Sequence, residues 1–442
     1  MALVFLLLAL TMFHVALARG ADWWLIIWIF FLVDSLFFLV SPERTHWEGI
    51  GRVSDIGLIV CALYVILVPR LRKRLPYIFT LPISRTVFGL GAIVVIGVVV
   101  TQMRYGGNVV LALRLAREYF FYIAFFIFLS ILLERKAFQR IPRLFTIVML
   151  LICIAYILQS FLPAGMVLNN SAEESYSTFD LIPNRIYLNY MEMYSGLFVI
   201  IGFLLLVHSQ RHRLLGLFLT CVFLCQAFLT QHRTLWVTIV VGIIASTFMW
   251  PRKRGYSIGR VLLALGLFTG VSIVVANVAG LQQSVVERVV QGFADTPFTE
   301  GTLTGRLVTS ENYLRLLSQN VVQGVGLVHP DTGVLGTTEQ TEYVSELGSV
   351  VLIFHFGIIG LLWLIWLSKV FHARVRSLVV NSEVEDYQRA ILIGCYGFFA
   401  GTLFTSILNG GFTMAGGIIL FSLMFAYAEA LRFHVDRKAT AR

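Results

Sequence analysis

Long apolar runs alternate with short polar segments along most of the chain, as in LFFLV (36–40), GAIVVIGVVV (91–100) and YIAFFIFLSILL (122–133). A helix that crosses the hydrocarbon core of a bilayer needs about 20 apolar residues, and on that criterion the pattern predicts about thirteen membrane spans. Their predicted limits are 2–18, 22–40, 53–69, 86–101, 117–133, 144–162, 189–207, 214–230, 235–250, 259–279, 348–368, 389–408 and 412–431.

The predicted fold is an all-α, polytopic bundle of about 12–14 transmembrane helices, which forms a single membrane domain over residues 1–442. Hydrophobic residues make up 58% of the chain and charged residues only 13%, which excludes an ordinary soluble core. The first apolar run lacks a basic segment before it and a clear stop after it. We therefore expect a retained helix there and not a cleaved signal peptide.

Basic residues gather in the segments that join one set of span ends. Cytoplasmic loops are enriched in Lys and Arg, so these segments are predicted to face the cytoplasm. They contain Arg70, Arg72, Lys73, Arg74, Arg85, Arg135, Lys136, Arg140, Arg143, Arg211, Arg213, Arg252, Lys253, Arg254, Arg260, Arg432, Arg437, Lys438 and Arg442. Alternation then places a small acidic loop, 163–188, and a large acidic loop, 280–347, outside, together with the N-terminus. The formal net charge of +10 thus follows from topology and does not indicate nucleic-acid binding.

The large loop 280–347 has the composition of a folded segment. Its stretches LQQSVVERVVQGF (281–293) and ENYLRLLSQNVV (311–322) space their apolar residues as amphipathic helices do. Gly324 and Gly326 follow them. Long external loops on compact proteins often carry function, although this one could also be a simple cover over the helices.

The five cysteines lie within or at the edges of apolar spans, which favours helix packing over a disulfide framework. Cys221 and Cys225 are one helical turn apart, but two thiols without a nearby His or carboxylate make a poor zinc site. We therefore expect no metal and no cofactor.

Arginines on the predicted outer side break the usual charge bias and indicate an anionic partner. They are Arg104, Arg114, Arg117, Arg185, Arg233, Arg288, Arg306 and Arg315. Any single one could reach lipid phosphates at the membrane surface. A cluster of guanidinium groups, which bind phosphate oxygens in a bidentate manner, is better suited to a lipid-linked diphosphate.

Three stretches combine such arginines with apolar helices in a characteristic order. They are RYGGNVVLALRLAREYFFY (104–122), QHRTLWVTIVVG (231–242), and GRLVTSENYLRLLSQNVVQGVGL (305–327) followed by SELGSVVLIFHFGIIGLL (345–362). In this order and spacing the chain resembles the O-antigen ligase and Wzy-type polysaccharide polymerase family of bacterial inner-membrane glycosyltransferases. The resemblance covers most of the chain at the level of topology.

The resemblance implies a GT-C-like membrane enzyme that polymerises undecaprenyl-diphosphate-linked repeat units into O-antigen or exopolysaccharide at the periplasmic face of the inner membrane. It implies membrane lipids and a chain-length regulator as further partners. Arg117, Arg233 and Arg306 match motif positions that would stabilise the leaving diphosphate without a metal ion. Arg114 and Arg185 would support them.

The catalytic base is where the chain departs from the ligase pattern. Ligases carry a histidine eleven positions before the first glycine of the closing helix, and here that position is Glu346, counted back from Gly357. A polymerase is therefore favoured over a ligase, with Glu346 as the expected base. Its alternative role is that of an acid opposing the dipole of the closing helix. His329 and His355 are the other candidates, although a lone histidine on an apolar helix is more often packing.

Two further functions remain open from the sequence. One is an O-antigen ligase that transfers glycan to lipid A core. The other is a transporter of an anion or a lipid-linked sugar, which usually shows two matching halves with broken helices near the midplane. We find no such internal symmetry. A third alternative is an enzyme-like scaffold that binds lipid-linked sugar without transferring it.

Overall fold

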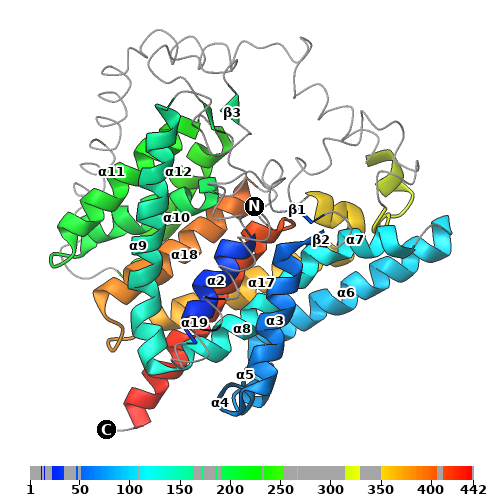
Figure 1. Ribbon diagram of the computed structural model, residues 1–442, viewed down its shortest axis with the longest axis horizontal. Coiled ribbons are helices and arrows are strands. Elements are labelled where there is room, and N and C mark those ends of the chain that lie inside the picture. Colours follow the sequence, from blue (N-terminus) through cyan, green and yellow to red (C-terminus); the bar gives the residue numbers. More distant parts are fainter. Residues whose placement is uncertain are drawn as a thin grey trace.

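The fold is helical throughout the part of the chain that the structure describes, which confirms the predicted all-α class (Figure 1). The computed structural model describes residues 22–33, 46–47, 51–106, 109–162, 172–173, 185–186, 191–230, 233–251, 314–328, 350–405 and 412–440, with Thr11, His14 and Gly266. Within these ranges the only strands form two short antiparallel ladders. These are β1 (His46–Trp47) with β2 (Gly51–Arg52), and β3 (Ala172–Glu173) with β4 (Arg185–Ile186).

Each predicted span overlaps a helix, except 2–18 and 259–279, which lie outside the described residues apart from Thr11, His14 and Gly266. The first half of the chain forms α2 (Trp24–Val33), α3 (Val53–Leu67), α4 (Pro69–Arg72), α5 (Leu75–Thr80), α6 (Pro82–Tyr105), α7 (Val109–Phe120), the 3-10 turn η2 (Phe121–Ile123), α8 (Ala124–Leu132) and α9 (Arg135–Ser160). The second half forms α10 (Met191–His208), α11 (Arg213–Thr230), α12 (Arg233–Met249), α17 (Val350–Val379), α18 (Asp386–Phe404) and α19 (Ala415–Thr440).

Several of these helices have the length and composition of membrane spans. Among the described residues six are long and apolar enough to cross a bilayer, or up to seven if a pair bent by 83° at Val68 and Pro69 is one span. The outer face of α6 carries exposed apolar side chains, such as Val95, Val99 and Met103, that are suited to lipid. The chain is therefore a multi-pass membrane protein.

The helix that begins at Val109 starts earlier than the predicted span 117–133. It runs through α7, η2 and α8 to Leu132. Hydropathy alone placed its start late because Arg114 and Arg117 dilute the apolar run. The residues around them still follow a helical period, with Ala112, Ala116 and Tyr119 on the buried face.

Helix α19 lies at the centre of the bundle. Its most apolar window is 83% buried, against 33% for α9. It packs against α2, α8, α9, α17 and α18. Helices α10, α11, α12 and α18 form a second group beside it, at the upper left of Figure 1. Glycines allow the close helix contacts of this group: a Cβ atom on Gly216 of α11 would lie 2.4 Å from the backbone nitrogen of Leu206 in α10.

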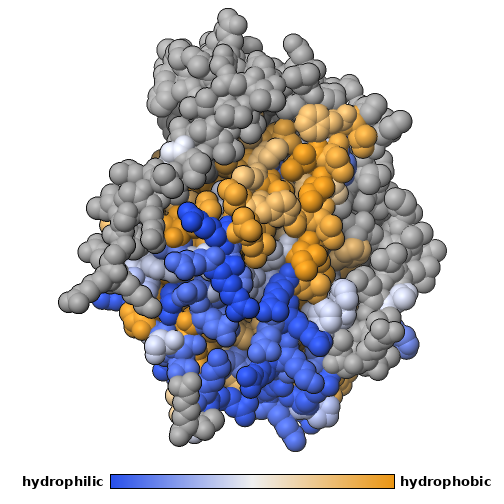
Figure 2. Space-filling model, turned by 90° about the vertical axis from the view of Figure 1, so that its left-hand side faces the viewer, coloured by the Kyte–Doolittle hydropathy of each residue, from blue (hydrophilic) through white to orange (hydrophobic). Residues whose placement is uncertain are grey.

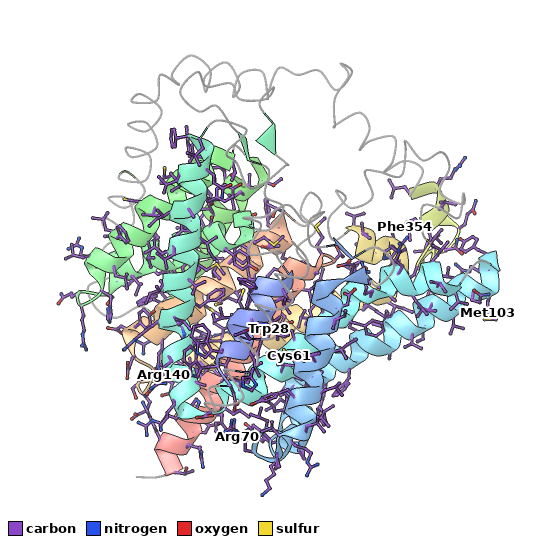
Figure 3. All side chains as sticks on the ribbon, viewed as in Figure 1. Trp28, Cys61, Arg70, Met103, Arg140 and Phe354 are labelled. Carbon is purple, nitrogen blue, oxygen red and sulfur yellow. The ribbon has the colours of Figure 1, made fainter. Side chains whose placement is uncertain are left out.

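The basic segments lie together at one end of the bundle, called here the basic end. Arg74 donates a hydrogen bond to the carbonyl of Ser130 near the end of α8, at 2.6 Å. One cavity brings Arg135, Arg437 and Glu385 together, and a second brings Arg211 beside the same Glu385. Figure 2 shows a hydrophilic lower end beneath an apolar belt, and Figure 3 labels Arg70 and Arg140 at that lower side. The clustering agrees with the predicted alternation of loops.

A buried carboxylate ties the start of α2 to this end. Asp22 is 2% exposed, and its Oδ1 accepts hydrogen bonds from Tyr64 Oη and from Arg70 Nη2, each at 2.6 Å. Arg70 is half-exposed, so solvent screens its share of the interaction. Tyr64 is therefore the better-shielded partner.

We expect Tyr64→Phe to lower the free energy of unfolding by about 2 kcal/mol, because a buried charged acceptor loses a donor. Thermal unfolding of the detergent-solubilised protein, followed by circular dichroism, measures the change. Tyr77→Phe is the matched control, since Tyr77 is 42% exposed. Equal melting temperatures for the two variants would show that the Tyr64 hydrogen bond contributes nothing.

Candidate functional site

Helix α7 presents two arginines at the end of the bundle opposite the basic end. Arg114 and Arg117 are three residues apart and share a helix face, as expected if their segment is helical. Arg114 is exposed, and the side chain of Arg117 is 28% exposed. The buried face of α7 packs toward α6 and α19. One side of α7 thus carries both arginines, with Arg114 the more exposed of the two.

Arg117 is held by two carboxylates. One of its terminal nitrogens lies 3.4 Å from Asp55 Oδ2 of α3, and the other lies 3.5 Å from Glu118 Oε1. The other oxygen of Glu118 accepts a hydrogen bond from the backbone N–H of Ala415, at 3.2 Å. Glu118 therefore also satisfies a free donor at the start of α19. The result is a charged cluster of α3, α7 and the first turn of α19 in which the guanidinium position is set from two sides.

Next to α7, helix α17 is broken at Gly357, which has φ 60° and ψ −146°. In an unbroken helix, the N–H groups of Ile358 and Ile359 would donate to the carbonyls of Phe354 and His355. Here those N–H groups donate instead to the carbonyls of Val321 and Val322, at 2.9 and 3.4 Å. A segment of the loop predicted to be external has thus inserted into the break.

The two carbonyls freed by the break find partners in the same inserted segment. Val325 N–H donates to the Phe354 carbonyl at 2.8 Å, and Gly326 N–H donates to the His355 carbonyl at 3.1 Å. Backbone that leaves a helix at membrane depth must be satisfied by the protein, and residues 321–326, called here the glycine loop, do so. Phe354, labelled in Figure 3, marks this place at the upper right of the bundle.

Glycine is required on both sides of this interlock, which is the set of backbone hydrogen bonds between the break in α17 and the glycine loop. Gly324 has φ 73°, and a Cβ atom there would lie 2.5 Å from the backbone of His355 and from the nitrogen of Gly357. A Cβ atom on Gly357 would lie 2.4 Å from the carbonyl oxygen of Val321. The Gly-Val-Gly pattern noted in the sequence therefore serves backbone packing, which the spacing alone did not reveal.

Helix α6 fastens the glycine loop from the other side. Arg104 Nη1 donates to the Gly324 carbonyl at 2.8 Å, and Leu327 N–H donates to Thr101 Oγ1 at 2.6 Å. Arg104 was expected among the arginines facing an anionic partner. In the structure its guanidinium binds the protein's own backbone.

His355 lies inside this arrangement. It is 4% exposed, its Nδ1 shares a hydrogen bond of 3.0 Å with the hydroxyl of Tyr119, and aromatic rings surround it. Of the two roles considered from the sequence, these contacts favour packing. The side chain of His355 thus links α17 to Tyr119 of α7, which is two residues from Arg117.

The other predicted site residues are described only in part. Glu346, Arg306 and His329 lie outside the described residues. Arg185 and Arg233 are described by their backbones alone: Arg185 pairs with Glu173 in the β3–β4 ladder, and Arg233 begins α12. Arg315 is exposed on a helical turn over 314–318, and Arg288 lies outside the described residues.

The elements that carry these arginines fall into two places. Figure 1 shows α12 and β3 at the upper left, in the group that contains α9 to α11, and α7 on the right beside α6. β4 contacts α9 and α11. Arg185 and Arg233 thus belong to one side of the bundle, and Arg104, Arg114 and Arg117 to the other. The described backbones therefore place these five arginines in two groups.

Asp55 and Glu118 were not singled out from the sequence. Both had a usable signal: Asp55 is an acid within an apolar run, and Glu118 directly follows Arg117 in LAREYF. An acid at the edge of a span normally indicates a partner on a neighbouring helix. Among the described residues, His, Cys, Asp and Glu side chains form no group of three that could hold a metal ion. No family model and no curated protein matches this sequence.

Proposed function

We propose that this protein polymerises undecaprenyl-diphosphate-linked oligosaccharide units into O-antigen or exopolysaccharide at the periplasmic face of the bacterial inner membrane. The observation that carries the proposal is the pair of arginines on α7, of which Arg114 is exposed and Arg117 is partly exposed and held in place by two carboxylates, at the end opposite the basic end. The order of sequence motifs and the multi-pass helical fold support it. The proposed partners are the lipid-linked glycan, membrane lipids and a chain-length regulator.

The proposed chemistry is a glycosyl transfer without a metal ion. The acceptor hydroxyl oxygen bonds to the anomeric carbon of the donor, its proton passes to Glu346, and the bond to the diphosphate oxygen breaks. Arg114 and Arg117 hold the departing undecaprenyl diphosphate, whose charge grows as that bond breaks. Arg306 and His329 take part in binding diphosphate or glycan in this proposal. Arg185 and Arg233, whose elements lie on the other side of the bundle, bind the glycan.

Asp55 and Glu118 act in this scheme as positioning residues. They hold the planar fork of Arg117 before substrate arrives, so little conformational entropy is lost when phosphate oxygens bind. The two carboxylates also compete with the diphosphate for Arg117. Binding of the carrier would therefore exchange one of these partners for a phosphate oxygen.

Purified protein given one lipid-linked repeat unit is expected to produce a ladder of products that differ by whole repeat units. The products are separated on a gel after release of the glycan from the carrier. A parallel reaction that contains lipid A core distinguishes a ligase, which would give a single transferred product. Absence of any new glycosidic bond in both reactions, with intact folded protein, would contradict the proposal.

One observation favours a transporter as the second candidate, namely the break in α17 at Gly357. Broken helices often expose backbone groups that bind a transported solute. Here the freed N–H and carbonyl groups are taken by the glycine loop, which leaves this break without open backbone donors. Uptake of labelled lipid-linked sugar across vesicles that contain the protein, without polymer formation, would favour this second candidate.

A further inference from the structure

A polar cavity opens at the basic end between the start of α9, the start of α18 and the end of α19. Its volume is about 250 Å³. Arg135, Arg437 and Lys438 contribute positive charge to its lining, and Glu385 contributes the single carboxylate. Gln139, Gln388 and His434 also line it. The cavity therefore has the charge and the donors that suit a phosphate group.

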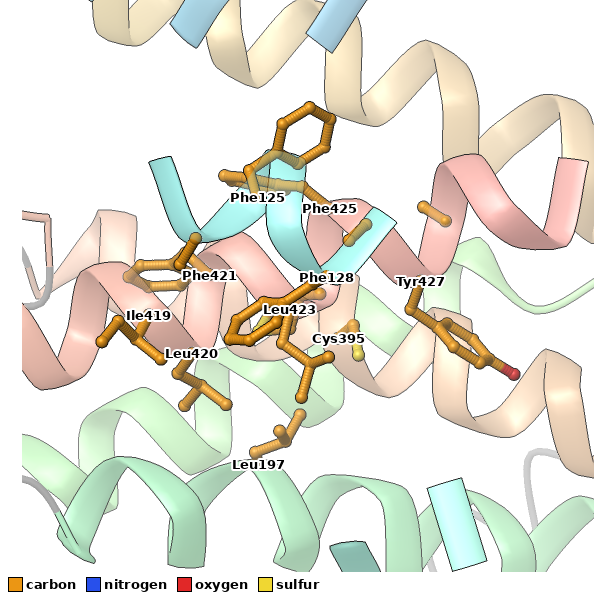
Figure 4. Packing of buried hydrophobic residues seen from close by; sticks show 14 of the residues in the cluster. Phe125, Phe128, Leu197, Cys395, Ile419, Leu420, Phe421, Leu423, Phe425 and Tyr427 are labelled. Carbon is orange, nitrogen blue, oxygen red and sulfur yellow. The ribbon is translucent and has the colours of Figure 1, made fainter. Parts of the chain in front are cut away.

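An apolar slot lies one helical turn deeper between the same three helices and α10. On α9, Gln139 lines the polar cavity and Pro142, three residues further along, lines the slot. On α18, Gln388 and Ile391 are related in the same way. The slot measures about 50 Å³. A single water needs about 10–15 Å³ on this measure, so the slot accommodates roughly three or four methylene-sized groups. Three of the residues that line it, Cys395, Leu420 and Leu423, belong to the packed hydrophobic cluster drawn in Figure 4.

Tyr427 lies between the polar cavity and the apolar slot. It is 5% exposed and lines the slot, and its hydroxyl has no hydrogen-bond partner among the described residues. Its ring stacks on Phe138, with centroids 5.3 Å apart, and the ring of Phe138 contacts that of His434 at 4.6 Å. Phe138 and His434 both line the polar cavity. A buried hydroxyl without a partner is costly, and a ligand oxygen at this level would satisfy it.

We propose that this crevice binds one anionic glycerophospholipid. The phosphate is held by Arg135, Arg437 and Lys438, an ester carbonyl accepts the hydrogen bond of Tyr427, and part of an acyl chain enters the slot. A soluble phosphate would contact only the three cations and would leave the Tyr427 hydroxyl and the slot unused. The order of charged cavity, buried hydroxyl and apolar slot along one set of membrane helices matches the order of groups in such a lipid. This site lies at the basic end and is independent of the proposed glycosyl transfer.

The larger cavity at the basic end lacks these properties. It measures about 860 Å³, and its lining balances Arg211 and Arg213 against Glu385 and Asp386. The buried Arg389 in its wall already donates to Asp386 and to the carbonyls of Val379 and Asn381. Charge complementarity thus favours the smaller crevice as the lipid site.

Native mass spectrometry of the full-length protein in detergent, titrated with phosphatidylglycerol or with phosphatidylcholine, tests the site. We expect selective retention of phosphatidylglycerol. Loss of two cations in Arg135→Gln with Lys438→Gln is expected to weaken that retention by about tenfold or more. Tyr427→Phe is expected to weaken it by about fivefold while leaving the preference for the anionic headgroup.

Two controls make the result decisive. Arg72→Gln with Arg376→Gln removes the same charge from exposed positions at the same end that do not line the crevice, and should retain the lipid as the unchanged protein does. Inorganic phosphate should not displace the lipid. Equal retention of the two lipids, equal loss in the control pair, or full displacement by inorganic phosphate with no effect of Tyr427→Phe would each overturn the proposal.

Discussion

Arg117→Ala is expected to lower the rate of glycan chain growth by about a hundredfold to a thousandfold, the usual cost of removing one preorganised donor from a developing anion. The effect on folding should be small, because the ion pairs of Arg117 with Asp55 and Glu118 are partly exposed. The measurement is the rate of ladder formation from one lipid-linked repeat unit, at equal amounts of folded protein.

Arg117→Lys keeps the charge but not the planar fork, so it should recover only part of the lost rate. Arg85→Ala serves as the matched control, since Arg85 is exposed on α6 at the basic end. If Arg117→Ala extends chains at the unchanged rate, α7 does not hold the diphosphate and the proposed site is wrong.

Gly357→Ala should destabilise the protein by on the order of 3–5 kcal/mol, because two costs combine. The backbone at φ 60° and ψ −146° is nearly closed to residues with a Cβ atom. That atom would also lie 2.4 Å from the Val321 carbonyl oxygen, which accepts the Ile358 N–H. Relief of the clash would break the interlock between α17 and the glycine loop. The change is measured as the melting temperature in detergent by size-exclusion chromatography after heating.

Gly106→Ala separates backbone strain from the clash. Gly106 ends α6 with φ 58°, and a Cβ atom there meets nothing within 4 Å. This variant should lose only about 1–2 kcal/mol. If Gly357→Ala has the same melting temperature as Gly106→Ala, the contact with the glycine loop does not stabilise α17.

Prediction from the sequence was most accurate where one side chain pattern decides the structure. Apolar run length determined the helices α6, α9, α11 and α17, because backbone groups in a bilayer must be satisfied within the helix. It was less accurate where charged residues interrupt or follow such a run. Arg114 and Arg117 hid the first turns of α7. The expected span 53–69 matches α3, but the basic segment after it is also helical, over α4 and α5, and is bent by 83° from α3.

The candidate site was predicted only in its basic half. A charge bias is visible in the order of residues, so the arginines on α7 could be named in advance. The pairing of Arg117 with two carboxylates could not be predicted, although each acid had a signal of its own in the sequence. Asp55 contacts Arg117 only because α3 and α7 pack together. Arg104 donates its hydrogen bond to the carbonyl of Gly324, more than two hundred positions away in the sequence.

By itself the sequence determined that the chain is an all-α, multi-pass membrane protein with its basic segments gathered at one end. These properties follow from local hydrophobicity and charge, which each segment carries without reference to any other. Only the tertiary structure decided that a glycine loop closes the break in α17, that two carboxylates hold Arg117, and that α9, α18 and α19 leave a crevice with a buried Tyr427 hydroxyl. Such contacts depend on which distant segments pack together, and no local pattern in the chain specifies that pairing.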